Sequence, residues 1–536
     1  MTFRKLGIIN IILLIIIIIF SPHPWYFLML TSAQIIFVPL VLDLIFKGDN
    51  KKFPWYLPYF FILASLAVLI LQVTNDTPWD LFLALPYFIF TLMVALCGFV
   101  RFLNRGFIHL EEFMIDMGMI YLTIGGAWFL AYEGNIETGF SSMLSWLTGI
   151  HFHYSAFLLP VFAGFLGRLY KPAFYKWISI IILLSPIAVA IGITYSRVVE
   201  LLAVILYIIG IYGLIILSFK IADQLPLQKG LTRISFSALG VSILFSLLYA
   251  LGNVTYQFHI TIDFMLYFHG ITNSIVFALM GVIGWSVQVP SANYNKCSFP
   301  ISRFSGKGKI GEKFLISKTD SQKYNGLVDD MDMYKPDINE TLSTTVKDFY
   351  ENTTAYRLLA EVKWRSWFKP FAGIYRLFSH KMQQINLPFS SKSVEMTGDI
   401  FSIDDKKDGR SNVRAWVRKI NEDIVFVALY SSHQESGRTY MNIALPLPWS
   451  SMIGILELNQ YGGDLRLTSK KRTSNADSGI YLAIGSNLFK LPFEEQFDVE
   501  EIEEGILKAK HTMWLFSVPF LSIDYRIYKL DKEMEI

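Results

Sequence analysis

The first 288 residues of the chain are almost continuously apolar, and this feature restricts the fold more than any other. A bilayer core of about 30 Å needs roughly 20 apolar residues per crossing helix, because each helical residue rises only about 1.5 Å. Because a spanning segment must satisfy its own backbone polar groups, such segments predict a bundle of transmembrane helices. Ten of them begin near residues 6, 26, 57, 81, 113, 144, 177, 200, 236 and 264.

The first apolar segment, Leu6–Phe20, is short and follows Arg4 and Lys5, as the core of a signal peptide would. The five residues after it are Ser-Pro-His-Pro-Trp, which offer no small-residue cleavage site. The sequence therefore predicts a retained anchor.

The lysines and arginines predict the orientation of the bundle. Alternate connections, together with the N-terminus, hold thirteen of these residues, whereas the opposite connections hold only Arg197. Positive charge is retained on the cytoplasmic side of a membrane, so both termini are expected there. The thirteen are Arg4, Lys5, Lys47, Lys51, Lys52, Arg101, Arg105, Arg168, Lys171, Lys176, Lys220, Lys229 and Arg233.

The rest of the chain has an ordinary polar composition, and the sequence divides into three parts. Residues 1–288 are predicted to form the transmembrane domain, 289–344 a flexible linker, and 345–536 a cytoplasmic α+β domain with an antiparallel sheet. Helices are expected at 346–361, 363–384 and 494–510, and period-two alternation predicts strands between 413 and 530. A net charge of +3 gives no indication of nucleic-acid binding.

A strip near the start of the C-terminal domain interleaves basic and bulky aromatic residues. It runs Lys-Trp-Arg-Ser-Trp-Phe-Lys from residue 363, and Pro370 interrupts it. Two interpretations remain open: a core helix with solvated cations, or a segment that docks on a membrane surface carrying anionic lipid at the cytoplasmic face. The residues expected to meet the membrane are Trp364, Arg365, Trp367 and Lys369.

Histidines in the outer halves of the predicted helices are candidate functional groups, because ionisable side chains at membrane depth are rare. His153 and His269 are expected at similar depth, facing each other around one shared ligand or metal ion, with His151 as the substitute for His153. The alternative is that each histidine bonds a neighbouring helix and only fixes packing. Asn273 lies one turn from His269, and Arg197 with Glu200 could complete a polar, ligand-binding cluster.

The motif His-Phe-His-Tyr at 151–154, followed by Phe157, Pro160 and Gly164, resembles the YndJ-like family, as does Phe-His-Gly at 268–270 with Asn273. This is a family of functionally uncharacterised bacterial membrane proteins. The resemblance covers mainly the first 290 residues and implies a bacterial plasma membrane, but it supplies no activity and no cofactor.

Two classes of function remain open from the sequence. One is a membrane protein that binds a ligand in the outer half of the bundle, transporter-like or sensor-like, with a cytoplasmic accessory domain. The other is a membrane redox or metal-dependent enzyme that uses the histidines. The lack of a nucleophile elbow, a phosphate loop or an H-E-x-x-H motif favours the first class. The cofactor, if any, is unknown.

Overall fold

The computed structural model divides into two compact units. The first comprises Met1–Arg105 and His109–Tyr294, and the second comprises Gly106–Ile108 and Asn295–Ile536. The structure describes residues 2–106, 109–222, 224–257, 260–292, 299–306, 308–310, 319–334, 342–461, 463–470, 476–485 and 487–530.

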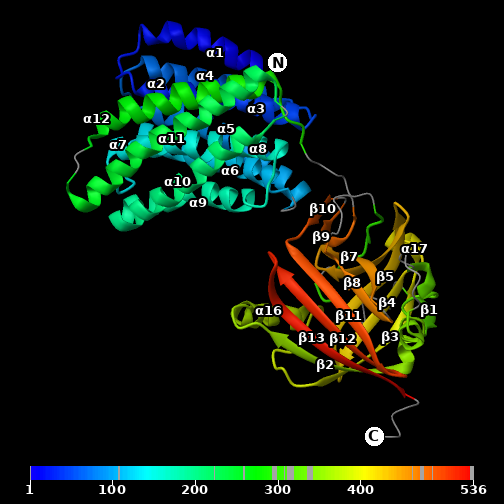
Figure 1. Ribbon diagram of the computed structural model, residues 1–536. Helices are drawn as coiled ribbons and strands as arrows, with labels where there is room; N and C mark the ends of the chain where they lie inside the picture. Colours follow the sequence, from blue (N-terminus) through cyan, green and yellow to red (C-terminus); the bar gives the residue numbers. More distant parts are fainter. Residues whose placement is uncertain are drawn as a thin grey trace. The chain divides into compact units, whose positions relative to one another are not determined.

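The first unit is built from helices alone in its described residues (Figure 1). Among the described residues of this unit, nine helices are long and apolar enough to cross a membrane, and they coincide with nine of the ten predicted segments. They are Phe27–Gly48 (α2, η1 and α3), Tyr56–Val73 (α4), Asp80–Leu103 (in α5, Asp80–Arg105), Leu110–Glu133 (α6), Ser142–Leu169 (α7, η2 and α8), Tyr175–Tyr195 (α9), Arg197–Lys220 (α10), Pro226–Thr255 (α11) and Ile262–Val287 (α12, η3, η4 and α13).

The tenth predicted segment is the helix α1, Phe3–Ile18, which at 16 residues is shorter than the nine spans. Its beginning lies beside the end of α3 (Val38–Gly48), where the backbone nitrogen of Arg4 donates to Asp43 at 3.2 Å. The connection after α1 lies beside the end of α4, where Nε2 of His23 is 2.9 Å from the carbonyl oxygen of Thr74. The helix α1 therefore runs from one end of the bundle to the other.

Two of the spanning helices contain a π-helical stretch next to a proline. The stretch η1, Ala33–Phe37, precedes Pro39, and η2, Tyr154–Leu158, precedes Pro160. A proline inside a helix has no N–H to donate and clashes with the carbonyl four residues earlier, so the helix widens there. Side chains of other helices bond such carbonyls. Asn10 donates to the carbonyl of Ile35 at 2.9 Å. The last span holds two further π stretches, η3 (Met265–Gly270) and η4 (Thr272–Leu279).

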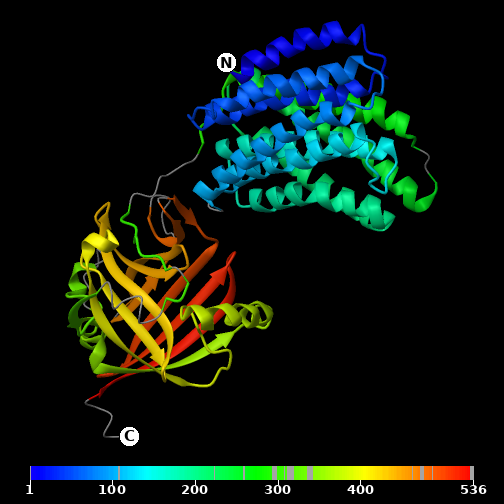
Figure 2. The ribbon, with the colours of Figure 1, turned by 180° about the vertical axis from the view of Figure 1, so that it is seen from behind.

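The second unit is a closed antiparallel barrel (Figure 2). Ten of its strands form a ring in the order β7-β6-β5-β4-β3-β2-β13-β12-β11-β8, and β7 pairs with β8 to close it. The ring strands are β2 Tyr356–Trp364, β3 Val394–Ile403, β4 Arg414–Ile420, β5 Asp423–Glu435, β6 Arg438–Leu447, β7 Ser450–Tyr461, β8 Asp464–Thr468, β11 Phe493–Glu503, β12 Ile506–Leu515 and β13 Val518–Lys529. Outside the ring, β1 (Thr319–Tyr324) pairs with β3, β9 (Gly479–Ile484) with β7, and β10 (Asn487–Lys490) with β9.

Strand periodicity divides the apolar residues of this unit between the two faces of the barrel wall. Trp416 and Tyr430 belong to a cluster that draws on strands all around the ring, so this cluster fills the interior. Their sequence neighbours Ala415 and Leu429 belong to a second cluster on the outer face of the wall. The alternation that predicts half-buried strands therefore gives a wall that is covered on both faces at β4 to β7, whereas the outward side chains of β2 and β12 are more exposed.

Two of the predicted helices in this unit are wrong in whole or in part. The segment 346–361 begins in α15 (Thr344–Glu351) but continues as the strand β2, whose side chains alternate between buried and half-exposed. The segment 494–510 is the hairpin of β11 and β12, which turns near Gly505 at φ +82°. Its charges pair across the two strands, Asp498 opposite Lys510 and Glu500 opposite Lys508, instead of along a helix axis. The third prediction, 363–384, contains α16 (Lys369–Met382).

The described parts of residues 289–344 differ from the flexible linker that the sequence predicts. Phe299, Phe304 and Ile310 are buried against the outer face of the barrel wall. The strand β1 extends the sheet at β3, and Met331 and Tyr334 are buried as well. These residues belong to the second unit. The sequence does not predict β1, because its alternation of apolar and polar residues is short and lies in a polar segment rich in serine and lysine.

Candidate functional site

A cavity of about 250 Å³ lies inside the helical bundle. We call the end with the connections 74–79, 134–141 and 256–261 the outer end and the opposite end the inner end; the cavity lies toward the outer end. The helices around it are α7 (Ser142–His153), α9, α10, α11 and the π-helical part of the last span. Most of its lining is apolar; the polar side chains are Thr148, His151, Tyr154, Ser155, Arg197, Glu200, Tyr207, Ser242, Ser246, Tyr249, His269 and Asn273.

Two histidines of the cavity lie next to each other across α7 and η3. The ring centroids of His151 and His269 are 6.5 Å apart, and the rings are within 27° of parallel. Nδ1 of His151 is 2.8 Å from the carbonyl oxygen of Leu147, so Nδ1 carries the proton and donates it. The neutral ring is then left with Nε2 as an acceptor. The structure thus places His269 beside His151, the residue that the sequence analysis gives as the substitute for His153.

His269 is held by hydrogen bonds with Ser242 and Asn273, and the hydroxyl of Ser246 also lies 3.3 Å from its Nδ1. Its Nδ1 donates to the carbonyl of Ser242 at 3.0 Å, and its Nε2 accepts from the Asn273 amide at 3.0 Å. The Ser242 hydroxyl in turn donates to Oδ1 of Asn273 at 2.7 Å. These bonds assign the tautomer of His269 and leave neither ring nitrogen free. Asn273 therefore orients His269, as its position one turn away predicts.

His153, the other residue of the predicted pair, lies in a different environment. It is fully buried and is not part of the cavity lining. Its Nδ1 donates to the carbonyl of Gly149 at 2.7 Å, and its Nε2 accepts from the hydroxyl of Tyr87 at 2.7 Å. With both nitrogens of His153 and of His269 engaged, the geometry does not favour a metal ion shared by these two. For His153 the packing interpretation fits.

Arg197 and Glu200 lie at the start of α10 and border the cavity. Nη1 of Arg197 donates to Oε2 of Glu200 at 3.0 Å; the Arg197 side chain is 53% exposed and that of Glu200 only 4%. Gly192 makes this burial possible, since a Cβ at that position would come within 2.4 Å of the Glu200 backbone. The pair therefore places one buried carboxylate and one half-exposed cation beside the same cavity.

The inner end of the bundle holds a buried network of charged side chains that the sequence reasoning missed. We call it the inner charge network: Asp49, Arg101, Arg105, Glu112, Asp116 and Arg168. Three cations meet three carboxylates, and each of the six side chains is at most 6% exposed. Arg101, Arg105 and Arg168 are among the thirteen lysines and arginines that predict the orientation of the bundle. Ten of the thirteen remain when these three buried arginines are left out.

Glu112 is the centre of the inner charge network. It accepts from Arg105 at 2.6 Å and from both Nε and Nη2 of Arg168 at 2.7 Å. Asp116 pairs with Arg101 at 2.7 Å, and Asp49 pairs with all three arginines. A signal for this network does exist in the sequence. Arg101 with Arg105, and Glu112 with Asp116, each stand four residues apart and so share one helix face.

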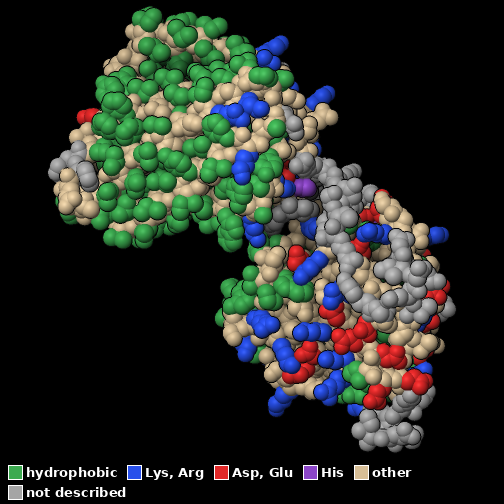
Figure 3. Space-filling model, in the orientation of Figure 1, with side chains coloured by type: hydrophobic (Ala, Val, Ile, Leu, Met, Phe, Trp, Pro, Cys, Tyr) green, Lys and Arg blue, Asp and Glu red, His purple; other side chains and the backbone are tan. Residues whose placement is uncertain are grey.

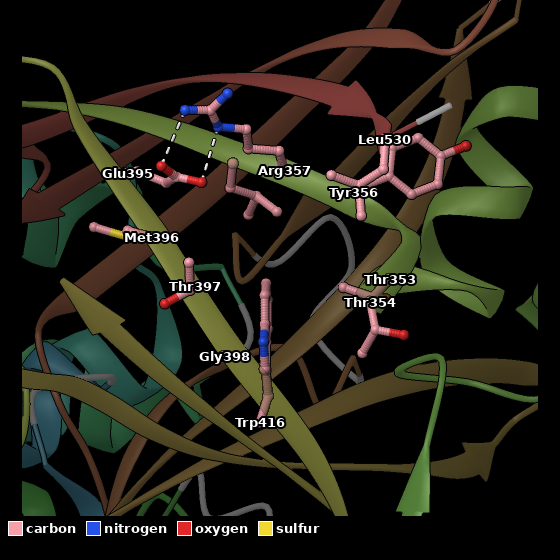
Figure 4. Close-up of a pocket in the computed structure, with 11 residues that line it drawn as sticks. Thr353, Thr354, Tyr356, Arg357, Glu395, Met396, Thr397, Gly398, Trp416 and Leu530 are labelled. Atoms are coloured by element: carbon pink, nitrogen blue, oxygen red, sulfur yellow. Dashed lines mark hydrogen bonds and ion pairs between the residues drawn. The ribbon is translucent and has the colours of Figure 1, made fainter. Parts of the chain in front are cut away.

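The barrel has a small pocket of about 190 Å³ where β2 and β3 separate (Figure 4). Only Leu358–Ala360 of β2 pairs with β3, and Trp416 of β4 lies at the base of the gap. The two charged side chains at its rim bond each other: Nε of Arg357 donates to Glu395 at 2.8 Å and Nη2 at 3.1 Å. The pocket therefore offers mainly threonine hydroxyls and apolar surface.

The four residues predicted to meet the membrane differ in their exposure. Trp364 is half-buried, stacks on Phe368, and donates from Nε1 to the carbonyl of Pro388 at 3.0 Å. Arg365, Trp367 and Lys369 are exposed. The strip is thus partly core and partly surface.

In the described part of the chain, nine apolar helices that could span a bilayer precede a closed antiparallel barrel, and this combination defines a multi-pass membrane protein with an attached barrel domain. The model of the family described as "YndJ-like protein" matches residues 28–277. The "Uncharacterized membrane protein YndJ" of Bacillus subtilis (strain 168) is 38% identical over 461 residues, which cover 84% of each chain. The chain therefore belongs to the YndJ-like family. No solved structure matches it.

Proposed function

We propose that this membrane protein binds a small, largely apolar ligand in the cavity at the outer end of its bundle. The observation that carries the proposal is the convergence of His151, His269 and Glu200 on one mostly apolar cavity of about 250 Å³. Binding sites are typically apolar hollows with a few placed polar groups, and they span about 300–1,000 Å³. The present volume lies just below that range and therefore suits a small ligand.

The free acceptor nitrogen of His151 defines the polar part of the ligand. An acceptor without a partner favours a ligand that donates a hydrogen bond, such as a hydroxyl or an amine. His269 cannot compete for that role, because its own nitrogens are held by Ser242 and Asn273. The ligand is thus an amphiphile, with one donor group near His151 and an apolar body between α9 and α11.

The alternative of a metal-dependent or redox enzyme receives less support. In the part of the chain that the structure describes, no group of three or more His, Cys, Asp or Glu side chains could hold a metal ion. We propose a membrane protein of the sensor or transporter type, with the ligand-binding end outside a bacterial plasma membrane. In this proposal α1 is a tenth crossing, and both termini, with the barrel, are cytoplasmic.

Cysteine labelling tests the orientation and the cavity together. The two native cysteines are replaced (Cys97→Ala, Cys297→Ser), and single cysteines are placed at Glu137, Lys52, Ala190 and Ala163. In intact cells a membrane-impermeant thiol reagent should label Glu137→Cys at the outer end and spare Lys52→Cys at the inner end. It should also label Ala190→Cys, which lines the cavity, and spare the fully buried Ala163→Cys.

Each arm of this experiment has an outcome that contradicts the proposal. Labelling of Lys52→Cys from outside would reverse the orientation. Equal labelling of Ala190→Cys and Ala163→Cys would mean that nothing distinguishes the cavity from the packed interior. The ligand itself is sought by mass spectrometry of extracts of the purified protein, and a bound amphiphile should fall about tenfold when Ala190→Trp fills the cavity. An unchanged extract would count against binding there.

A further inference from the structure

The C-terminal unit exposes one face of the helix α16 that is made of large apolar side chains. Phe371, Ile374, Leu377 and Phe378 are 59%, 60%, 68% and 59% exposed. Their spacing of three, four and seven residues places them on one side of the helix. Within the described residues nothing covers that side, and Figure 3 shows green side chains gathered over α16.

The side of α16 that is buried against the barrel is made of small residues, not of the large apolar ones. The helix begins with Pro370 in its first turn and ends at Gln383, which adopts a left-handed conformation at φ +56°. The residues of α16 that it buries fully are Ala372 and Ser379, seven positions apart. A core helix would bury its phenylalanines and expose its alanine and serine. α16 has the reverse arrangement, so its apolar face is available to something other than the barrel.

The apolar surface continues beyond the helix onto the neighbouring hairpin. Trp367 is 45% exposed and is held by a hydrogen bond from its Nε1 to the carbonyl of Pro519 at 3.0 Å. Phe516 and Val518, at the turn between β12 and β13, are 56% and 49% exposed. The patch therefore rests on a rigid base formed by the strands.

Along the sequence, the charges on and around α16 have one sign, and of these Lys363 pairs with Glu361 and Asp524. Between Glu361 and Glu395 the chain has no acidic residue and six cations: Lys363, Arg365, Lys369, Arg376, Lys381 and Lys392. Lys369, Arg376 and Lys381 are all exposed. An apolar helix face with exposed lysine and arginine around it is the combination that binds at the boundary of anionic headgroups and acyl chains.

We propose that α16 docks on the anionic surface of a bilayer, with Phe371, Ile374, Leu377 and Phe378 among the acyl chains and Lys369, Arg376 and Lys381 at the headgroups. The bilayer is favoured over a protein partner because the chain is itself anchored in one. Val287 ends the last span, and Phe299 is already part of the barrel unit. Twelve residues reach at most roughly 40 Å, which keeps the effective concentration of lipid high.

The test uses the full-length protein in nanodiscs, with both native cysteines replaced as above. An environment-sensitive fluorophore is attached to Leu377→Cys on α16, or to Ser411→Cys as a matched exposed control on the far side of the barrel near α17 (Asp405–Asp408; Figure 1). Lipids carrying a quencher in the acyl chain should quench the Leu377 label at least about twofold more than the Ser411 label. The difference should be larger in discs with anionic lipid and smaller at high salt.

Charge variants separate a lipid surface from other occupants. Lys369→Glu, Arg376→Glu and Lys381→Glu together should remove most of the extra quenching, whereas Lys406→Glu on α17 should leave it unchanged. Equal quenching at Leu377 and Ser411 would overturn the proposal. Energy transfer between labelled copies without lipid quenching would overturn it in favour of a second copy of the chain. Nanodiscs expose both membrane faces, so this result does not depend on the orientation proposed above.

Discussion

At the inner end of the bundle six charged side chains pair with one another, whereas at the outer end polar side chains border a cavity. Three arginines and three carboxylates neutralise each other in the inner charge network. At the outer end His151 keeps an unused acceptor, and Glu200 has Arg197 as its ion-pair partner, whose side chain is half exposed. Both ends are polar inside a membrane protein, but the charges of the inner one neutralise each other, although Oδ2 of Asp116 has no hydrogen-bond partner among the described residues.

This difference separates two uses of polarity at membrane depth. Burying a charge in a low-dielectric interior lowers the stability of the fold by roughly several kcal/mol unless partners of opposite charge compensate it. The inner charge network meets that requirement without a ligand, so it holds four helices and the segment after α13 together. The outer end meets it only in part, which is the condition expected of a binding site.

The largest expected effect is on the inner charge network. Glu112→Gln removes one of three carboxylates and leaves three buried arginines with two partners. Breaking a buried ion pair typically costs about 3–5 kcal/mol, so most of the variant should fail to fold. The measurement is the amount of monodisperse protein, and its melting temperature, in detergent size-exclusion chromatography of a fluorescent fusion.

Glu200→Gln is the matched change at the outer end, and it should lower the melting temperature far less than Glu112→Gln. Its only ion-pair partner among the described residues, Arg197, can turn into water. Equal losses for the two variants would break the distinction between the two ends.

A smaller loss of stability is expected when either of two histidines in one turn of α7, His151 or His153, is replaced by leucine. His153→Leu leaves the Tyr87 hydroxyl buried without its acceptor, which costs about 1–3 kcal/mol. His151→Leu removes a side chain that borders the cavity and should cost under about 1 kcal/mol. Thermal unfolding of the two proteins compares them directly. A greater loss for His151→Leu would mean that His151 is the packing histidine.

The smallest effect is expected for an ion pair in contact with water, at Asp348 of the barrel. Burial alone would raise the pKa of Asp348, but hydrogen bonds from Lys529, Tyr356 and Asn352 lower it below its ordinary value. A lowered pKa stabilises the folded state above the unfolded value of about 3.9, and this contribution is lost as the pH falls through the folded pKa.

Asp348→Asn should therefore cost about 0.5–1 kcal/mol at pH 7, the range of exposed ion pairs, and the cost should disappear as the pH falls through the lowered pKa of Asp348. Hydrogen exchange of peptides from β2 and β13, which the Asp348 contacts join, reports this difference. A loss as large as that of Glu112→Gln would show that burial does not set the scale of these effects.

The sequence predicts the bundle well and the barrel poorly, for a physical reason. A stretch such as Tyr56–Val73 is apolar on all sides, and only a membrane helix explains it. In the barrel, by contrast, the charges of Glu494–Lys510 fit a helix dipole and a hairpin equally well. Only the partner strand decides between them, and a partner is not visible in a local pattern.

The candidate site was predicted at the level of helices but not of individual side chains. The outer halves of α7 and of the last span do contribute histidines to one cavity, and Asn273 does contact His269. Depth alone could not choose between His151 and His153, which point in directions about 200° apart. The choice depends on Tyr87 of α5, which lies 66 residues away and takes His153 as its partner.

The π-helical stretches have a consequence for how proteins of this family can diverge. A π turn holds one more residue than an α turn, so loss of one residue from Tyr154–Leu158 would restore the α-helical pitch without interrupting the crossing. The part of the helix before the deletion, with His151, would then turn by about 100° relative to α8. Single-residue changes in helix length, rather than substitutions, could therefore exchange the side chains that face the cavity.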